Sequence, residues 1–184
     1  MNIENFPAIT KVTLDKKSRA RVAIGNAARN VIIGNKNRNR LVGNEGPDVL
    51  TGKQNADIFD LGKRPDRLQP QTMDKITDFS GKGGEGDRIL INLARYQIAS
   101  GTTKTFKSFE TTAAFGELPR GAAAKSNEDF VFNQQTGILY WNENGSANGL
   151  GAGGALVRLN AIAGDVPELT TILSSPESPV VEFM

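Results

Sequence analysis

The sequence predicts an all-β protein in which short parallel strands stack on one another, and three observations lead to this prediction. A nine-residue pattern repeats four times without a gap from Gly25. Residues 87–93 alternate apolar and polar side chains, as a half-buried strand does. The runs 129–133 and 137–142 flank a turn and predict a β-hairpin.

The repeat has three fixed places. Its rows read GNAARNVII, GNKNRNRLV, GNEGPDVLT and GKQNADIFD. Glycine opens each row, Asn or Asp holds the sixth place, and the eighth place is Ile32, Leu41, Leu50 or Phe59. Because one row is too short to bury its apolar residue alone, the rows must stack, two rows to a coil.

Residue chemistry predicts the shape of one row. Glycine at the first place permits a tight turn, through either a left-handed or a closely packed backbone. Asn or Asp at the sixth place can fix the turn by hydrogen-bonding to nearby backbone. The next three residues then form a short strand with only the middle side chain facing inward. The apolar spacing extends backwards through Ala23 to Leu14, so residues 1–24 are either a lead-in or degenerate first coils.

The C-terminal half is predicted to be β-rich with one or two short helices. The apolar spacing in 105–115 (TFKSFETTAAF) is nearly helical, which predicts a helix there. Residues 156–162 are predicted to pair back onto the hairpin as a strand. A capping-box pattern, Asp165 with Glu168, predicts a second helix over 166–174.

Composition excludes most catalytic chemistry. The 184 residues include no His and no Cys, which excludes a Ser-His-Asp triad and thiol chemistry and disfavours a tetrahedral zinc site. No pair of carboxylates stands out as acid and base, so we expect the chain not to be an enzyme. No stretch approaches the ~20 apolar residues of a membrane span, and MNIENFPAITKV does not have the features of a signal peptide.

The stretch GNEGPDVLTGKQNADIFDLG resembles the RTX (hemolysin-type) calcium-binding repeat family. DKITDF, GEGDRILINL and FVFNQQTGILYWNENG are similar to the closing and C-terminal segments of secreted RTX proteins, so the resemblance covers roughly residues 25–175. It implies a parallel β-roll over 25–93 and a β-sandwich-like C-terminal cap over 94–184. It also implies Ca²⁺ as a cofactor, and a bacterial protein that is secreted by a type I system or displayed at the cell surface.

The resemblance further implies a set of metal ligands. In this family the sixth-place Asp binds Ca²⁺ together with backbone carbonyls, between rows two apart. The candidates in this chain are Asp48, Asp57, Asp74, Asp78, Asp66, Asn39, Asn30, Asn44 and Gly46. Asn offers a neutral oxygen, which is a poorer ligand for a hard dication than a carboxylate. We therefore expect rows 25–42 to stack without calcium, and rows 43–60 with DKITDF to hold the ion sites.

Two alignments remain open beyond the fourth row. A further row can be drawn at 61–69, with Asp66 in the sixth place. The family alignment instead makes 63–73 an inserted loop and gives the sixth place to Asp74. The two prolines of that segment favour the loop.

A basic tract suggests a different kind of partner. Between Asp15 and Glu45 there are eight Lys or Arg residues and no Asp or Glu. Four of these residues would recur along the stacked turns: Arg29, Lys36, Arg38 and Arg40. Such a ladder attracts polyanions such as acidic polysaccharide or lipopolysaccharide, although a merely solvated basic face is the competing interpretation. Nucleic acid is not expected, because the tract has no aromatic residue for base stacking.

Two functions therefore compete. The first is an extracellular module in which Ca²⁺ stabilises the β-roll after export. The second is a structural, self-assembling or adhesive protein that binds polyanionic glycan with little need for calcium. Folding that depends on calcium would distinguish the first from the second. The tail SSPESPVVEFM is either a secretion signal or a frayed terminus.

Overall fold

The computed structural model describes residues 1–61, 72–80, 86–92, 106–109, 129–134, 136–143, 151, 153–160, 169–172 and 180–183. Within these residues every regular element is a β-strand, which confirms the predicted all-β class. The strands are β1 (Lys11–Thr13), β2 (Val22–Ile24), β3 (Val31–Ile33), β4 (Arg40–Val42), β5 (Val49–Thr51), β6 (Ile58–Asp60), β7 (Asp74–Ile76), β8 (Arg88–Asn92), β9 (Phe106–Phe109), β10 (Phe130–Asn133), β11 (Ile138–Trp141), β12 (Gly154–Leu159), β13 (Leu169–Ile172) and β14 (Val180–Phe183).

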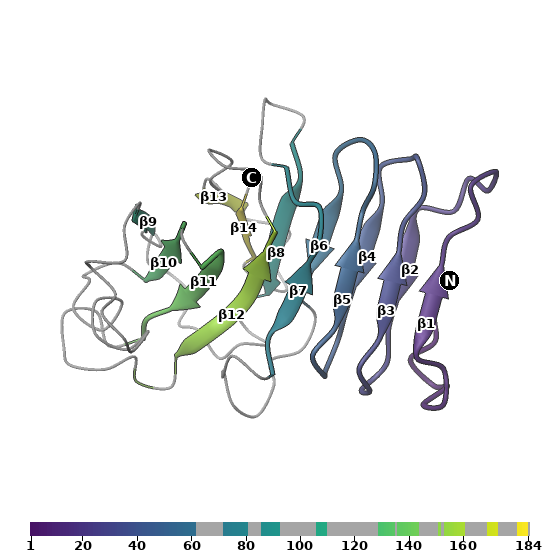
Figure 1. Ribbon diagram of the computed structural model, residues 1–184, viewed down its shortest axis with the longest axis horizontal. Helices are drawn as coiled ribbons and strands as arrows, with labels where there is room; N and C mark the ends of the chain where they lie inside the picture. The colour runs from purple at the N-terminus through teal and green to yellow at the C-terminus, as the bar shows by residue number, and fades with distance from the viewer. Residues whose placement is uncertain are drawn as a thin grey trace.

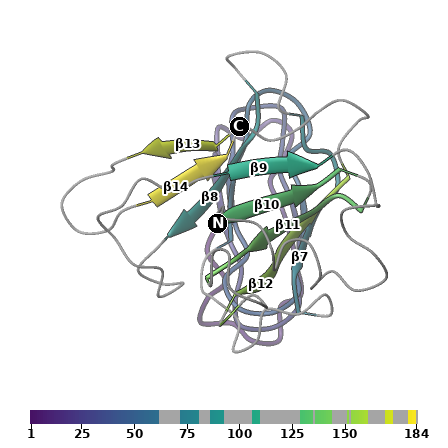
Figure 2. The same ribbon diagram turned by 90° about the vertical axis from the view of Figure 1, so that its left-hand side faces the viewer.

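The strands form two sheets, and consecutive strands from β1 to β8 alternate between them. One sheet has the order β1-β3-β5-β7-β12-β11-β10-β9, and the other has the order β13-β14-β8-β6-β4-β2. Neighbouring strands among the first eight are parallel, so the chain advances along the stack as it winds (Figure 1). Seen along the stack, the N-terminal turns lie one behind another (Figure 2). The predicted parallel stacking is confirmed.

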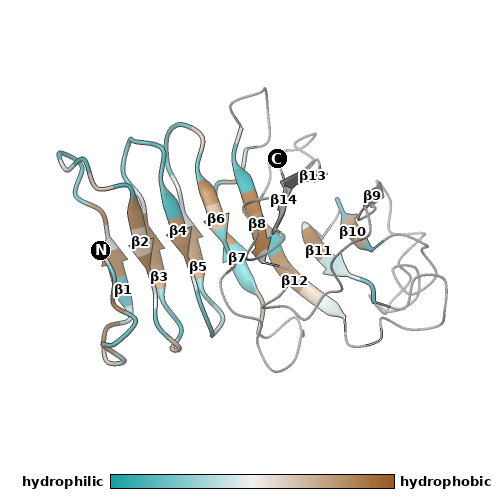
Figure 3. Cartoon of the chain, turned by 180° about the vertical axis from the view of Figure 1, so that it is seen from behind, coloured by the Kyte–Doolittle hydropathy of each residue, from teal (hydrophilic) through white to brown (hydrophobic). Residues whose placement is uncertain are grey.

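The core lies between the two sheets and is built from the eighth place of the repeat. Ile32, Leu41, Leu50 and Phe59 are the middle residues of β3, β4, β5 and β6, and each is fully buried. Because strand side chains alternate between faces, the residues on either side of each point away from this ladder. The strands are accordingly mainly hydrophobic in Figure 3, whereas the turns between them are mainly hydrophilic. The predicted strand in each row is confirmed.

Residues 1–24 contribute the first strand of each sheet, β1 and β2. Ala23 is buried in the middle of β2, which pairs with β4 in the same register as the later rows. In β1 it is Val12, rather than Leu14, that pairs with Ile32, although both side chains are buried. Residues 1–3 lie along the outer edge of β2, where the Ile3 amide donates to the Ile24 carbonyl at 3.0 Å.

The C-terminal strands continue both sheets. β10 and β11 form the predicted antiparallel hairpin, and β12 pairs back onto β11 as expected. β12 then joins β7 in parallel, while β14 joins β8 antiparallel. Since β14 is a hydrogen-bonded strand, the interpretation of the tail as frayed fails for Val180–Phe183.

The two predicted helices are wrong where the structure describes them. Phe106–Phe109, inside the predicted helix 105–115, is strand β9 and pairs with β10. Leu169–Ile172, inside the predicted helix 166–174, is strand β13 and pairs with β14. Both predictions relied on local signals, whereas hydrogen bonds to a distant strand decide the conformation of short segments rich in Thr and aromatic or branched residues. None of the described segments forms a helix that could cross a membrane.

Candidate metal centre in the stacked turns

The turns that precede the strands stack in two columns, because every second strand belongs to the same sheet. Each column places sixth-place side chains above one another. One column contains Asn30, Asp48 and Asp74, and the other contains Asn39, Asp57 and Asp87. All six side chains are buried. Polar groups in such positions must find hydrogen-bond partners or ions.

Each carboxylate in these columns is hydrogen-bonded to the row below it. Asp48 Oδ1 accepts from the Asn30 amide at 2.7 Å, and Asp74 Oδ1 accepts from the Asp48 amide at 2.9 Å. The second column repeats this arrangement. Asp57 Oδ1 accepts from the Asn39 amide at 2.7 Å, and Asp87 Oδ1 accepts from the Asp57 amide at 2.9 Å. One oxygen of each Asp therefore joins consecutive turns of a column.

Close packing explains the glycine that opens each row. A Cβ atom at Gly25 would lie 2.5 Å from Asn30 Oδ1 and 2.5 Å from the Gly43 carbonyl oxygen. At Gly43 it would lie 2.5 Å from Asp48 Oδ2. The sixth-place side chain thus occupies the space that any larger first-place residue would need. The closely packed alternative is correct, and these first-place glycines have no left-handed φ.

Left-handed backbone occurs instead at the second and fourth places of the third and fourth rows. The φ angles there are 71° at Asn44, 98° at Gly46, 84° at Lys53 and 68° at Asn55. The first two rows have no such residues among the described positive-φ positions. The turns of rows 43–60 therefore differ in conformation from the turns of rows 25–42.

In the first two rows the Asn side chains satisfy the turns without an ion. Asn30 Nδ2 donates to Asn26 Oδ1 at 3.0 Å and to the Ile9 carbonyl at 3.2 Å. Asn26 Nδ2 donates to the Phe6 and Ile9 carbonyls, each at 2.8 Å. In the second row Asn39 Nδ2 donates to Asn35 Oδ1 at 3.1 Å. Neutral amides thus hold both turns together.

Side chains from the third and fourth rows also reach back to carbonyls of the first two. Asn44 Nδ2 donates to the Gly25 carbonyl at 2.9 Å, and Lys53 Nζ donates to the Gly34 carbonyl at 2.6 Å. Asn55 Nδ2 donates to the Lys36 carbonyl at 2.6 Å. Protein N–H groups thus already occupy these three turn carbonyls.

The acidic rows contain oxygens that are not satisfied in this way. Among the residues that the structure describes, Asp48 Oδ2 and Asp57 Oδ2 are buried without a hydrogen-bond partner. A Cβ built on Gly43 would be 2.5 Å from Asp48 Oδ2 and 3.3 Å from Asp74 Oδ2, so these two carboxylate oxygens face the same small space.

Burial raises the pKa of all three central carboxyl groups. For Asp48 burial is the largest cause, and the Asp74 carboxylate raises the pKa further. Burial also raises the pKa of Asp74. Burial raises the pKa of Asp57 to about 7, against the lowering effect of the hydrogen bond from the Asn39 amide. Without a positive charge nearby, burial makes ionisation of these carboxyl groups costly and favours their protonated forms.

Three other predicted ligands, Asp78, Asp74 and Asp66, have different positions. Asp78 accepts hydrogen bonds from the Gly52 and Lys53 amides at 3.0 and 2.8 Å, so it closes the fourth-row turn. Asp74 lies on β7, which pairs with β5, so Asp74 takes the sixth place in the column after Asp48. Asp66 lies outside the described residues. Within the described ranges, no three or more acidic side chains cluster as a ready metal site, so backbone oxygens would have to complete the coordination.

Asp87 belongs to the site, but our sequence analysis did not select it. It accepts from the Asp57 amide through Oδ1 and from the Ser80 amide through Oδ2, at 2.9 Å each. Asp87 directly precedes β8, just as Asp48 and Asp57 directly precede β5 and β6. That shared position was the signal in the sequence that could have identified it.

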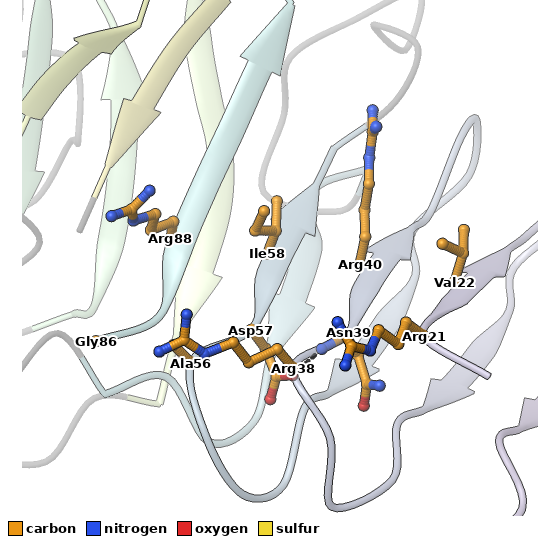
Figure 4. A pocket seen from close by; sticks show the side chains of 10 residues that line it. All are labelled: Arg21, Val22, Arg38, Asn39, Arg40, Ala56, Asp57, Ile58, Gly86 and Arg88. Carbon is orange, nitrogen blue, oxygen red and sulfur yellow. Dashed lines mark hydrogen bonds between the residues drawn. The ribbon is translucent and has the colours of Figure 1, made fainter. Parts of the chain in front are cut away.

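The four predicted basic residues separate into two places. Arg29 and Lys36 are exposed in the turns. Arg38 and Arg40 instead line a cavity of about 230 Å³ on the outer face of the β2-β4-β6-β8 sheet (Figure 4). Arg21, which belongs to the same basic tract, and Arg88, which lies outside it, line the same cavity.

No protein-family model matches this chain, and no curated protein matches it.

Proposed function

We propose that this chain is a calcium-binding β-roll module that functions outside the cell. The alternation of β1 to β8 between two parallel sheets supports the β-roll, as does the repeated fully buried ladder residue. The resemblance of the repeats to the RTX family supports calcium and export. The absence of Cys suits a chain that needs no disulfide after export.

The observation that carries this proposal is the pair of buried oxygens, Asp48 Oδ2 and Asp57 Oδ2, that lack hydrogen-bond partners among the described residues. Oxygen ligands from carboxylates and carbonyls are those that Ca²⁺ prefers. Asp48 with Asp74 would hold one ion, and Asp57 would contribute to a second site in the other column. The bound ion would supply the positive charge that lets these carboxyl groups ionise.

Calcium is confined in this proposal to the acidic turns. Asn30 and Asn39 satisfy their turns through their own amide groups, so rows 25–42 form without an ion. This division agrees with the formal net charge of +2, because a roll with an ion in every turn requires a large excess of carboxylates. The expected stoichiometry is therefore low, at one or two ions for the described rows.

The experiment is a calcium titration of metal-stripped protein, followed by circular dichroism and calorimetry. Extracellular calcium modules bind with Kd values of about 10⁻⁴–10⁻³ M, so the titration must extend to millimolar calcium. We expect heat of binding that Asp48→Asn and Asp57→Asn each reduce. Asn30→Ala is the matched control, because it alters the same column outside the acidic turns. Absence of binding at millimolar calcium would contradict the proposal.

A second candidate is a structural β-roll that needs no metal, and one contact favours it. Lys53 Nζ donates to the Gly34 carbonyl at 2.6 Å and so places a cationic group between the turns of the second column. A protein with this function would be fully folded in a chelator and would take up no calcium. Lys53→Gly then discriminates. Removal of the side chain frees the Gly34 carbonyl and should increase calcium uptake in the first case, whereas it should only lower stability in the second.

A further inference from the structure

The outer face of the six-stranded sheet carries a column of residues unrelated to the metal turns. Val22, Arg40, Ile58 and Arg88 are aligned by register across β2, β4, β6 and β8. The residues that follow them on the strands, such as Leu41 and Ile89, are buried in the core. Since neighbouring side chains on a strand point to opposite faces, the aligned column faces outward.

Arginine side chains dominate this outward cavity. Arg40 and Arg88 lie on strands separated by β6, which puts their backbones roughly 10 Å apart at a strand spacing of about 4.8 Å. Arg21 and Arg38 approach from the segments just before β2 and β4 (Figure 4). Arg21 and Arg38 are both exposed. Four arginines, on or just before three different strands, thus line the cavity of about 230 Å³.

The described residues that line the cavity include more basic than acidic side chains. Arg40 is held by Asp60, through Nη2 at 2.5 Å and Nε at 3.2 Å. Asp57 is the one acidic side chain among the described residues that line the cavity. The arginines therefore outnumber the acidic groups, and the local potential is positive.

We propose that this cavity binds the oxyanion groups of an acidic polysaccharide. Guanidinium groups match carboxylate and sulfate oxygens with paired hydrogen bonds. Val22, which is 42% exposed, and Ile58 give the cavity an aliphatic surface against which a sugar ring can pack. None of the described residues that line it is aromatic, so this part of the surface lacks the stacking platform on which single-stranded nucleic acid depends. This site goes beyond calcium binding, because it lies on the sheet face and not between the turns.

The test measures binding of short oligogalacturonate to the intact chain by calorimetry, with a heparin-derived oligosaccharide as the sulfated arm. Neutral oligogalactan and a single-stranded DNA oligomer of equal charge serve as comparison ligands. Arg21→Gln/Arg38→Gln removes two exposed charges from the cavity. Arg29→Gln/Lys36→Gln removes the same charge from exposed turn residues outside it. Arg40 is left unchanged, because its loss would remove two hydrogen bonds from the buried Asp60 carboxylate.

We expect the cavity variant to weaken binding of one or both acidic sugars by at least about tenfold, the effect of losing one or two charge-assisted hydrogen bonds. The turn variant should change binding by less than about twofold, and higher salt should weaken binding by the original chain. Equal losses in the two variants would overturn the proposal, because they would indicate diffuse attraction. DNA binding stronger than glycan binding, or no glycan binding at physiological salt, would also overturn it. Unchanged circular dichroism of both variants establishes that the comparison concerns folded protein.

Discussion

Replacement of Asp48 by Asn tests the metal centre most directly. Asp48 Oδ1 accepts from the Asn30 amide at 2.7 Å, and an Asn side chain retains that acceptor. Oδ2 is buried and has no hydrogen-bond partner among the described residues. An amide at its position would face Asp74 Oδ2, which borders the same space beside Gly43 and can accept a hydrogen bond. The variant therefore reproduces the ion-free arrangement of the first two rows.

The magnitude follows from the unsatisfied oxygen. A buried polar group without a partner costs about 1–3 kcal/mol, and more when it is charged. In a chelator Asp48→Asn should therefore raise the free energy of unfolding by about 1–3 kcal/mol at pH 7. Binding of one calcium ion, at a free concentration of 100 times its Kd, stabilises the original protein by about 2.7 kcal/mol. The variant should lack that stabilisation. The order of stability should consequently reverse when calcium is added.

The assay is urea unfolding, monitored by circular dichroism, in chelator and in millimolar calcium. Asn30→Asp is the reciprocal control, because it places a carboxylate where Asn30 Nδ2 now donates to Asn26 Oδ1 and the Ile9 carbonyl. That variant should be less stable in both conditions. If Asp48→Asn is less stable than the original chain in chelator and responds to calcium as fully, then Oδ2 is neither unsatisfied nor a ligand, and the reasoning fails.

Three further predictions concern the ladder, the glycines and pH. Leu50→Ala removes a fully buried ladder side chain and should lower the free energy of unfolding, measured in urea, by about 2–5 kcal/mol. Val49→Ala, at a half-buried position on the same strand, should lower it much less. Gly34→Ala would put a Cβ 2.6 Å from the Gly52 carbonyl oxygen and should cost about 1–3 kcal/mol, visible as a lower melting temperature; an unchanged value would mean that the turns do not pack as described. Burial raises the pKa of Asp57 from 3.8 to about 7, so folding favours its protonated form. The contribution of Asp57 to the free energy of unfolding is fully present below pH 3.8 and is lost as pH rises through about 7. The free energy of unfolding of the metal-free protein should therefore fall over that window. Asp57→Asn should flatten this part of the urea-midpoint profile against pH, and an identical profile in the variant would count against the assignment.

Much of the repeat region could be predicted from local sequence. The positions of the strands and their buried middle residues follow from a nine-residue period, because each row contains its own turn residues and one apolar side chain. The split between Asn turns and Asp turns is likewise visible in the residue types. Asn supplies both a donor and an acceptor, whereas an ionised Asp supplies acceptors alone. Among the described turns of the repeat, the buried oxygens without a hydrogen bond accordingly belong to Asp48 and Asp57.

The errors arose where distant partners decide the structure. Phe106–Phe109 and Leu169–Ile172 are strands because β10 and β14 pair with them, and no local pattern records those partners. Short segments gain their backbone hydrogen bonds from whichever strand lies beside them. Helical spacing of apolar residues over one or two helical turns favours a helix only weakly, and hydrogen bonds to a neighbouring strand outweigh it.

The sequence by itself determined the all-β class, the stacking of the rows, the inward ladder residues and the type of side chain in each turn. Asp74 as the residue after Asp48 was one of two alignments that the sequence left open, and the tertiary structure places it there. Only the tertiary structure added Asp87 to the second column and brought Arg21 and Arg88 into the cavity with Arg38 and Arg40. The physical reason is that a row's own turn and strand depend on adjacent residues. Which rows become neighbours depends on strand pairing across long and unequal separations, which the repeat pattern does not encode.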